Sequence, residues 1–300
     1  MRSIRIGVDL GGTKIEAAAL ADTGEIVARE RVPTPQSYDG TIDAIATVVN
    51  AVERSAGMRG TVGVGIPGAA NPITGLVKNA NSTRLIGQPL GKHLEEKLGR
   101  PIRVENDANC FAISEAADGA AAGADVVFGV ILGTGVGGGI VVGGRPLEGV
   151  NLIAGEWGHN PLPWMTADEY PGPMCFCGRP GCIERFVSGP ALASDFLAAT
   201  GHARTTREIA AEQDEASVAA MRRYVDRLAR ALASVINLLD PDVIVLGGGM
   251  SNVPNLAERA TAELPRYVFS DSVLTHVVRN KHGDSSGVRG AAWLWPLRSA

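Results

Sequence analysis

Two parts of the chain carry apolar runs of strand length that glycines interrupt. Apolar and polar positions alternate in residues 4–10, the Gly11-Gly12 pair follows, and residues 15–20 form a second apolar run. The same order recurs within residues 126–142, around a glycine-rich centre. A period of two predicts β-strands, and glycines between two such runs predict a hairpin turn. The sequence therefore predicts two units of strand, turn and strand.

Longer spacings predict helices between the strands. Apolar residues recur at helical spacing over residues 42–52 and, as one long stripe, over residues 218–239. Further strands are expected at residues 26–32, 61–66 and 243–246. Strands that alternate with helices in this order indicate an α/β fold in which helices cover a mixed sheet.

The chain of 300 residues is long enough for two domains. A stretch rich in Ala and Gly at residues 116–125 suggests the boundary. We expect a smaller first domain over residues 1–117 and a larger second domain over residues 118–285. The last segment, about residues 286–300, is expected to form a helix that packs back on the first domain and makes it discontinuous. Residues 161–173 are rich in proline and aromatic residues, which predicts an irregular excursion of the second domain.

Composition and charge exclude several classes of function. Hydrophobic residues (45%) and charged residues (20%) occur at the frequencies of globular proteins, which excludes disorder. A net charge of −4 without a run of Lys and Arg argues against a nucleic-acid partner. Residues 126–144 carry no charge over a length that could span a membrane, but their glycines argue against a membrane partner. No signal-peptide pattern precedes Asp9, so we expect a cytoplasmic location.

The two predicted hairpins place glycines where phosphate chemistry needs them. Asp9 lies at a strand end and precedes the turn residues Gly11, Gly12, Thr13 and Lys14. Backbone N–H groups without side chains can approach a phosphate closely, and a carboxylate can hold Mg²⁺. Gly133, Thr134 and Gly135 occupy the equivalent turn of the second unit, so the two hairpins together suggest a phosphate clamp. For either turn alone, a plain glycine hairpin is the alternative.

Three cysteines and a histidine have the composition of a zinc site. They are His159, Cys175, Cys177 and Cys182, in which the cysteines follow the spacing C-x-C-x4-C. Four soft ligands suit tetrahedral Zn²⁺, and a shell closed by protein ligands indicates a structural role. The alternative is three reduced cysteines in a loop. The remaining cysteine, Cys110, is expected to be a small buried residue.

Asp107 is a candidate general base. It follows the predicted strand 102–104, and a carboxylate at a strand end can accept a proton from a substrate. The same residue types are common at helix N-termini, so a helix cap is the alternative interpretation of Asn106 and Asp107.

Taken together, these motifs resemble the ROK family of sugar kinases and repressors, which has the actin-like ATPase fold. The resemblance covers the whole chain and is carried by residues 9–14, 65–68, 105–109, 133–138, 156–159 and 175–184. It implies two actin-like (ribonuclease H-like) α/β domains with a cleft between them. It also implies an ATP-dependent hexose kinase that acts as a homodimer.

The resemblance implies roles for individual residues. Asp107 would accept the proton of the attacking sugar hydroxyl, and the other sugar hydroxyls would be bound by Asn81, Asn106, Glu156, His159 and Glu184. Asp9 would hold Mg²⁺. His159 would use one ring nitrogen for zinc and the other for the sugar. ATP would be bound by Asp9, Gly11, Gly12, Thr13, Lys14, Gly133, Thr134, Gly135, Val136, Gly137, Gly138, Gly248 and Gly249.

Within the family, residues 78–83, 158–164 and 282–290 resemble the bacterial manno(fructo)kinases. This implies phosphorylation of fructose, and of mannose, at the 6-hydroxyl in preference to N-acetylated sugars. The alternatives are a glucokinase or an N-acetylhexosamine kinase, because every hexose presents similar hydroxyls. A sugar-responsive repressor would need a DNA-binding module ahead of the first glycine turn, and that turn begins at residue 9.

Overall fold

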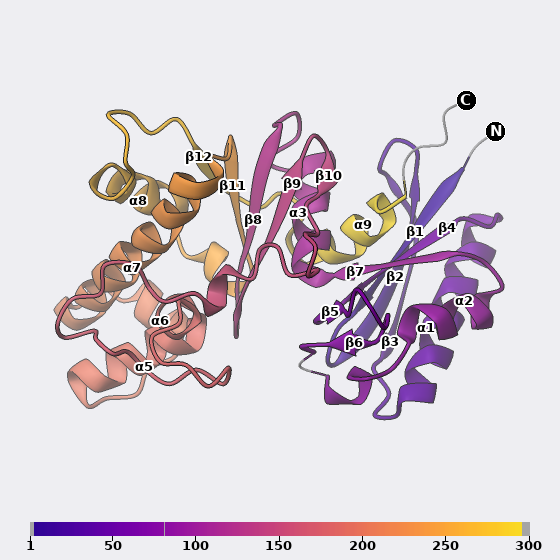
Figure 1. The fold of residues 1–300 in the computed structure, drawn as a ribbon, viewed down its shortest axis with the longest axis horizontal. Coiled ribbons are helices and arrows are strands. Elements are labelled where there is room, and N and C mark those ends of the chain that lie inside the picture. The colour runs from indigo at the N-terminus through magenta and orange to yellow at the C-terminus, as the bar shows by residue number, and fades with distance from the viewer. Residues whose placement is uncertain (1–2, 81, 296–300) are drawn as a thin grey trace. The chain divides into compact units, whose positions relative to one another are not determined.

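The computed structural model describes residues 3–80 and 82–295 (Figure 1). It divides into two compact units. Unit 1 comprises the residues up to 122, residues 139–154 and the residues from 284 onward, and unit 2 comprises residues 123–138 and 155–283. Residues 118–122, 139–154, 284 and 285, which were expected in the second domain, therefore group with the first.

The first sheet has the strand order β3-β2-β1-β4-β7. Its strands are β1 (Ile4–Leu10), β2 (Lys14–Ala21), β3 (Ile26–Pro33), β4 (Thr61–Ile66) and β7 (Ile102–Asn106). Strands β1, β2 and β3 are antiparallel, which confirms the predicted glycine hairpin, whereas β4 and β7 run parallel to β1. A two-stranded ribbon of β5 (Ala69–Ala70) and β6 (Val77–Lys78) follows β4.

Two helices supply the core on one face of this sheet. The apolar residues of β1 pack with those of α1 (Tyr38–Ala56) and α2 (Leu90–Leu98) in one buried cluster. Ser37 caps the start of α1 by accepting a hydrogen bond from the Gly40 N–H, and Gly57 ends the helix in a left-handed conformation with φ of 70°. The predicted helical stripe at residues 42–52 is confirmed.

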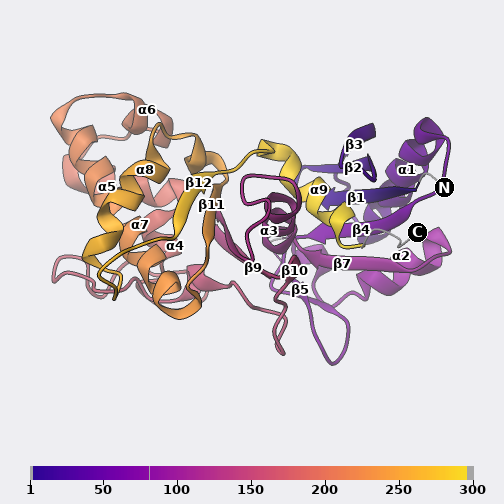
Figure 2. The ribbon, with the colours of Figure 1, turned by 90° about the horizontal axis from the view of Figure 1, so that it is seen from above.

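The C-terminal helix α9 (Ser286–Trp293) packs on the same sheet, beside α3 (Asp107–Ala117) (Figures 1 and 2). A Cβ atom at Gly7 would lie 1.8 Å from the Val288 carbonyl oxygen, and one at Gly63 would lie 1.9 Å from that of Ala291. Any larger residue at these strand positions would displace α9. Part of the glycine excess therefore serves helix packing on the sheet and not phosphate binding.

The second sheet has the order β10-β9-β8-β11-β12. Its strands are β8 (Val126–Leu132), β9 (Val136–Val142), β10 (Arg145–Pro146), β11 (Val243–Gly247) and β12 (His276–Arg279). The helices of unit 2 are α4 (Glu184–Val187), α5 (Gly189–Thr200), α6 (Thr206–Ala211), α7 (Glu215–Leu239) and α8 (Leu256–Glu263). Short 3₁₀ turns are η1 (Thr83–Leu85), η2 (Trp157–His159), η3 (Gly249–Asn252), η4 (Leu264–Arg266) and η5 (Gly283–Ser285). Two sheets with helices confirm the predicted α/β class.

The uncharged residues 126–144 form strands β8 and β9 and the turns that flank β9. Among the helices in the described part of the chain, none is both long enough and apolar enough to cross a membrane.

Candidate functional site

The glycine hairpin of unit 1 joins β1 to β2. The Gly11 N–H donates to the Lys14 carbonyl oxygen over 3.0 Å, and the Thr34 hydroxyl donates to the Gly11 carbonyl oxygen over 2.9 Å. A Cβ atom at Gly12 would have no heavy atom within 4 Å. The tip of the turn is therefore fixed by its own hydrogen bonds while its backbone is left open, as phosphate binding requires.

Asp9 is held near the end of β1, opposite Glu16 of β2. Burial, and secondarily the charge of Glu16, raises the pKa of Asp9 to about 6. Glu16 is almost fully buried and forms ion pairs with Arg31 at 2.6 Å, with Arg29 and with Lys14. Lys14 is therefore paired with Glu16 at 3.5 Å in this structure. Asp9 has the oxygen donors that suit Mg²⁺, and its buried charge would be stabilised by a cation.

Asn106 and Asp107 lie at the junction of β7 and α3. The Asn106 side-chain oxygen accepts hydrogen bonds from the N–H groups of Ala108 at 2.8 Å and Asn109 at 3.3 Å. Its side-chain nitrogen donates to the Gly68 carbonyl oxygen at 2.9 Å. The capping interpretation is therefore right for Asn106, which fixes the helix start. Asp107 is the exposed first residue of α3, where the helix dipole stabilises a carboxylate.

The glycine hairpin of unit 2 joins β8 to β9. The Gly133 N–H donates to the Gly135 carbonyl oxygen at 2.9 Å, and the Glu184 carboxylate accepts from the Val136 N–H at 3.0 Å. The Gly137 carbonyl oxygen accepts from the Trp157 ring N–H at 3.0 Å. The start of β9 therefore contacts residues 155–157 and Glu184. This part of the strand holds three residues predicted to bind ATP, which are Val136, Gly137 and Gly138.

A cavity of about 990 Å³ adjoins this hairpin within unit 2. Gly133 and Thr134 of the turn and Gly249 of η3 line it, so three of the residues predicted to bind ATP share one cavity. Gly248 precedes η3 with φ of 77°, and a Cβ atom there would lie 2.5 Å from the Leu132 carbonyl oxygen. Only glycine fits at this position, where the chain turns from β11 against β8.

The other walls of this cavity were not predicted from the sequence. They come from Pro190 and Ala193 of α5, from Arg207 and Ala210 of α6, and from residues 252–254. A signal for α6 was present, because Thr205 and Glu208 form a capping box at its start. The volume suits a ligand of nucleotide size, and the lining combines small apolar side chains with open backbone at glycines.

The four predicted zinc ligands lie together in unit 2. One ligand atom from each of His159, Cys175, Cys177 and Cys182 can be chosen so that all lie within 4.8 Å of one another. The Cys175 sulfur lies 3.6 Å from His159 Nδ1, and the Cys177 and Cys182 sulfurs lie 3.5 Å apart. Glycines at positive φ, Gly178 at 84° and Gly181 at 74°, allow the tight turn between the cysteines.

These separations fit a zinc ion. Bonds of about 2.3 Å to sulfur and about 2.05 Å to nitrogen in a tetrahedron place two sulfurs about 3.8 Å apart, and sulfur and nitrogen about 3.6 Å apart. The long gap between His159 and Cys175 does not separate the ligands, because the strand-like bridge between Pro161 and Cys182 returns the chain. His159 Nδ1 faces the cysteine, so this is the nitrogen that would bind a metal.

Asn81 lies outside the described residues. Glu156 is exposed and immediately precedes η2, which carries the buried Trp157 and ends at His159. One oxygen of the Glu184 carboxylate accepts from the Val136 N–H, and the other lies 3.8 Å from the Cys175 sulfur. Of the residues predicted to bind the sugar, unit 2 therefore places Glu184 and His159 at the same cysteine.

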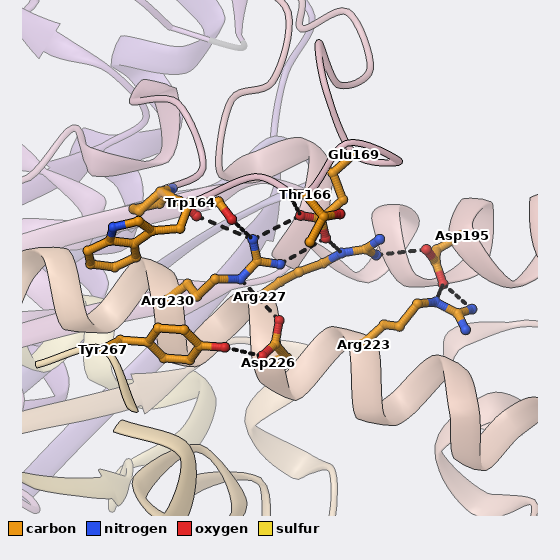
Figure 3. A network of polar contacts seen from close by, with 10 residues as sticks. Trp164, Thr166, Glu169, Asp195, Arg223, Asp226, Arg227, Arg230 and Tyr267 are labelled. Atoms are coloured by element: carbon orange, nitrogen blue, oxygen red, sulfur yellow. Dashed lines mark hydrogen bonds and ion pairs between the residues drawn. The ribbon is translucent and has the colours of Figure 1, made fainter. Parts of the chain in front are cut away.

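The excursion between His159 and Cys175 is fixed on α7 by a network of arginines and carboxylates (Figure 3). The guanidinium of Arg230 donates to Glu169 at 2.8 Å and to the Trp164 carbonyl oxygen at 2.8 Å, and Arg227 donates to Glu169 at 2.7 Å. Arg230 is buried and Arg227 is largely so, and Trp164 stacks on Tyr267. The loop that connects two ligands of the cysteine cluster is thus anchored independently of any metal.

This network predicts a loss of stability in acid. Burial alone would raise the pKa of Glu169, but hydrogen bonds from Arg230 and Arg227 outweigh it and lower the pKa from 4.5 to about 2. A carboxylate with a lowered pKa stabilises the fold above its unfolded pKa, and this contribution is lost as the pH falls from about 5 toward 2. We expect Glu169→Gln to be less stable than wild type at pH 7 and to lose less stability on acidification.

Denaturant unfolding of both proteins at several pH values between 7 and 3 measures the difference. Glu96→Gln, a substitution of an exposed glutamate on α2, is the control and should follow the wild-type pH dependence. Parallel pH profiles for wild type and Glu169→Gln would contradict the prediction.

Known proteins with similar sequences and folds match almost the whole chain. The ROK family matches residues 5–298. An N-acetyl-D-glucosamine kinase of Escherichia coli O6:H1 is 40% identical over 296 residues, which are 96% of this chain and 98% of the relative. A ROK hexokinase structure from Thermus thermophilus is 34% identical with a TM-score of 0.86, covering 98% of this chain and 97% of that one.

A third similar protein is a ROK family glucokinase from Streptomyces griseus, solved in complex with glucose and AMPPNP. It is 29% identical with a TM-score of 0.79, and the match covers 97% of this chain and 99% of that one. These matches confirm the predicted actin-like fold class.

Proposed function

This chain belongs to the ROK family, and we propose that it is an ATP-dependent N-acetylhexosamine kinase that phosphorylates the 6-hydroxyl of N-acetylglucosamine. The observation that carries the proposal is 40% identity, over 96% of the chain, to an N-acetyl-D-glucosamine kinase. The glucokinase solved with AMPPNP supports ATP as the phosphoryl donor.

The expected preference for fructose and mannose is not supported, and the relatives favour the N-acetylhexosamine alternative. One of the segments that suggested fructose has contacts of a structural kind. His159, within residues 158–164, faces the cysteine cluster, and Trp164 stacks on Tyr267 and accepts a hydrogen bond from Arg230. These contacts belong to the framework of unit 2 and do not distinguish one hexose from another.

We propose that Asp107 accepts the proton of the 6-hydroxyl as that oxygen attacks the γ-phosphorus. Its support is its place as the exposed first residue of α3, with the Asn106 cap holding the helix start. Phosphoryl transfer depends on positioning and on neutralising charge. Mg²⁺ bound near Asp9 would supply part of that neutralisation, and the open backbone of Gly12 would face the phosphates.

In unit 2, we propose that the cavity beside the Gly133 hairpin takes the adenosine part of ATP. The lining by Thr134 and Gly249 supports this assignment, because the turn offers backbone donors and η3 offers an open glycine. His159 would contribute its second ring nitrogen to the sugar, and zinc would hold the imidazole in place through Nδ1.

A phosphorylation assay on a panel of sugars tests the proposal. We expect kcat/KM for N-acetylglucosamine to exceed that for glucose, fructose and mannose by about tenfold or more, since a site built for an amide leaves polar groups unpaired without it. The product should carry its phosphate on the 6-hydroxyl. Higher kcat/KM for fructose or mannose would refute the N-acetylhexosamine assignment.

A further inference from the structure

A small cavity of about 60 Å³ lies within unit 1 beside the Asn106 cap. Its walls include Asn106 and Asn109 at the start of α3, Ala69 and Ala70 of β5, and Leu152 of the loop that follows β10. Roughly 10–15 Å³ of such volume holds one water, so the space takes about four groups of that size. The cavity adjoins the residue that precedes Asp107, the proposed general base.

Asn109, which lines this cavity, has an unused acceptor. Its side chain is only 6% exposed, and its nitrogen donates to a carboxylate oxygen of Glu105 at 3.0 Å. The same Glu105 oxygen accepts the Asn106 N–H at 2.7 Å, which fixes the orientation of the Asn109 amide. Its other end, Oδ1, is buried and has no hydrogen-bond partner among the described residues. A buried acceptor of this kind calls for a donor from a ligand.

The rest of the wall is mixed. Ala69, Ala70 and Leu152 add apolar groups, whereas Glu105 and Glu148 add carboxylates, which accept hydrogen bonds as Asn109 does. Leu152 has φ of 54°, a left-handed conformation that a leucine rarely adopts. The loop is tied down within unit 1, because the Leu152 N–H donates to the Gly149 carbonyl oxygen and the Lys78 ammonium donates to the Asn151 carbonyl oxygen at 2.9 Å.

We propose that this cavity binds the acetamido group of the sugar. An acetamido group has one donor, its N–H, which matches the single orphaned acceptor of Asn109. Its methyl group matches the alanines and Leu152, and its acetyl atoms fit a space for about four water-sized groups. Glucose, which carries a hydroxyl at the same carbon, fills none of the apolar part. This inference rests on the proposed N-acetylhexosamine kinase activity and names the residues that select its substrate.

The first test fills the cavity. In Ala70→Val two added methyl groups occupy the space, so the ratio of kcat/KM for N-acetylglucosamine to that for glucose should fall by about tenfold or more. The ratio of the affinity for N-acetylglucosamine to that for glucose, measured by calorimetry, should also fall. Ala28→Val is the matched control, because it makes the same change on β3, which is the edge strand of the first sheet opposite β7. It should leave the ratio within about twofold of wild type.

The second test enlarges the cavity and looks for a gain that damage to the fold would not give. In Leu152→Ala the wall recedes, so the ratio of kcat/KM for N-propanoylglucosamine to that for N-acetylglucosamine should rise by about fivefold or more. Unchanged ratios in both variants of an enzyme that prefers N-acetylglucosamine would overturn the cavity assignment alone. A wild-type enzyme that phosphorylates glucose but no N-acetylhexosamine would overturn the proposed function, and this inference with it.

Discussion

Replacing Asp107 with asparagine is expected to lower kcat by about 10²- to 10⁴-fold, or more, while sugar and ATP still bind. An amide keeps the shape and hydrogen-bonding capacity of the side chain but cannot take the proton of the attacking hydroxyl. The loss exceeds the usual range if the carboxylate also holds that hydroxyl in line with the γ-phosphorus. Steady-state kinetics with N-acetylglucosamine measure kcat, and calorimetry measures the binding of the sugar.

Two further variants separate catalysis from general effects of removing a carboxylate. Asp39→Asn makes the same change in the first turn of α1, at another exposed helix start of unit 1, and should leave kcat within about twofold of wild type. Asp9→Asn should lose activity that excess Mg²⁺ partly restores, because the change weakens the hold on the metal. Near wild-type kcat in Asp107→Asn would show that the base lies elsewhere and that Asp107 only stabilises the helix start.

Local patterns were sufficient to predict much of the fold. The first hairpin and the helix α1 follow from residue periodicity, because their apolar positions face one core and their turns carry glycine. The grouping of residues 139–154 with unit 1 could not be predicted in this way. It depends on contacts such as Gly139 against Asn109, where a Cβ atom would lie 2.8 Å from the Asn109 Cα, and such contacts leave no period in the sequence.

The candidate site was predictable where chemistry is carried by rare residue types at fixed spacing. The cysteine cluster is such a case, and its four ligand atoms lie together as expected. The cavity walls from α5 and α6 escaped prediction because Pro190, Ala193, Arg207 and Ala210 form no motif of fixed spacing. The Glu169 network escaped it as well, because Arg227 and Arg230 lie on the polar side of an apolar stripe and meet a partner about sixty residues away.

Asn106 makes two kinds of hydrogen bond, which reconciles the helix-cap interpretation of this segment with the catalytic one. As a cap it accepts two backbone hydrogen bonds, and as a tether it donates to Gly68 on the loop after β4. A rigid helix start is what a general base at the next position needs, because a hydroxyl must be met within hydrogen-bond distance. The capping role therefore supports a catalytic role for Asp107.

Replacing Cys177 with serine is expected to remove zinc and to lower both thermal stability and the efficiency with the sugar. Wild-type protein purified without chelators should contain about one zinc per chain, since three thiolates and one imidazole complete a tetrahedral shell. Loss of one ligand loosens the turn that holds His159, so kcat/KM for the sugar should fall by about 10- to 100-fold while KM for ATP stays within about twofold.

Cys110→Ser is the matched control for this change. Cys110 is fully buried against α9 and lies outside the cysteine cluster, so the control should cost thermal stability yet keep one zinc per chain. Metal analysis by mass spectrometry, thermal unfolding and kinetics on the same preparations give the three readouts. Wild-type protein without zinc would refute the metal site. Lower stability in Cys177→Ser with unchanged kcat/KM for the sugar would show that His159 does not need the metal. The contacts of Glu169 with Arg227 and Arg230 would then be enough to hold the loop that follows His159.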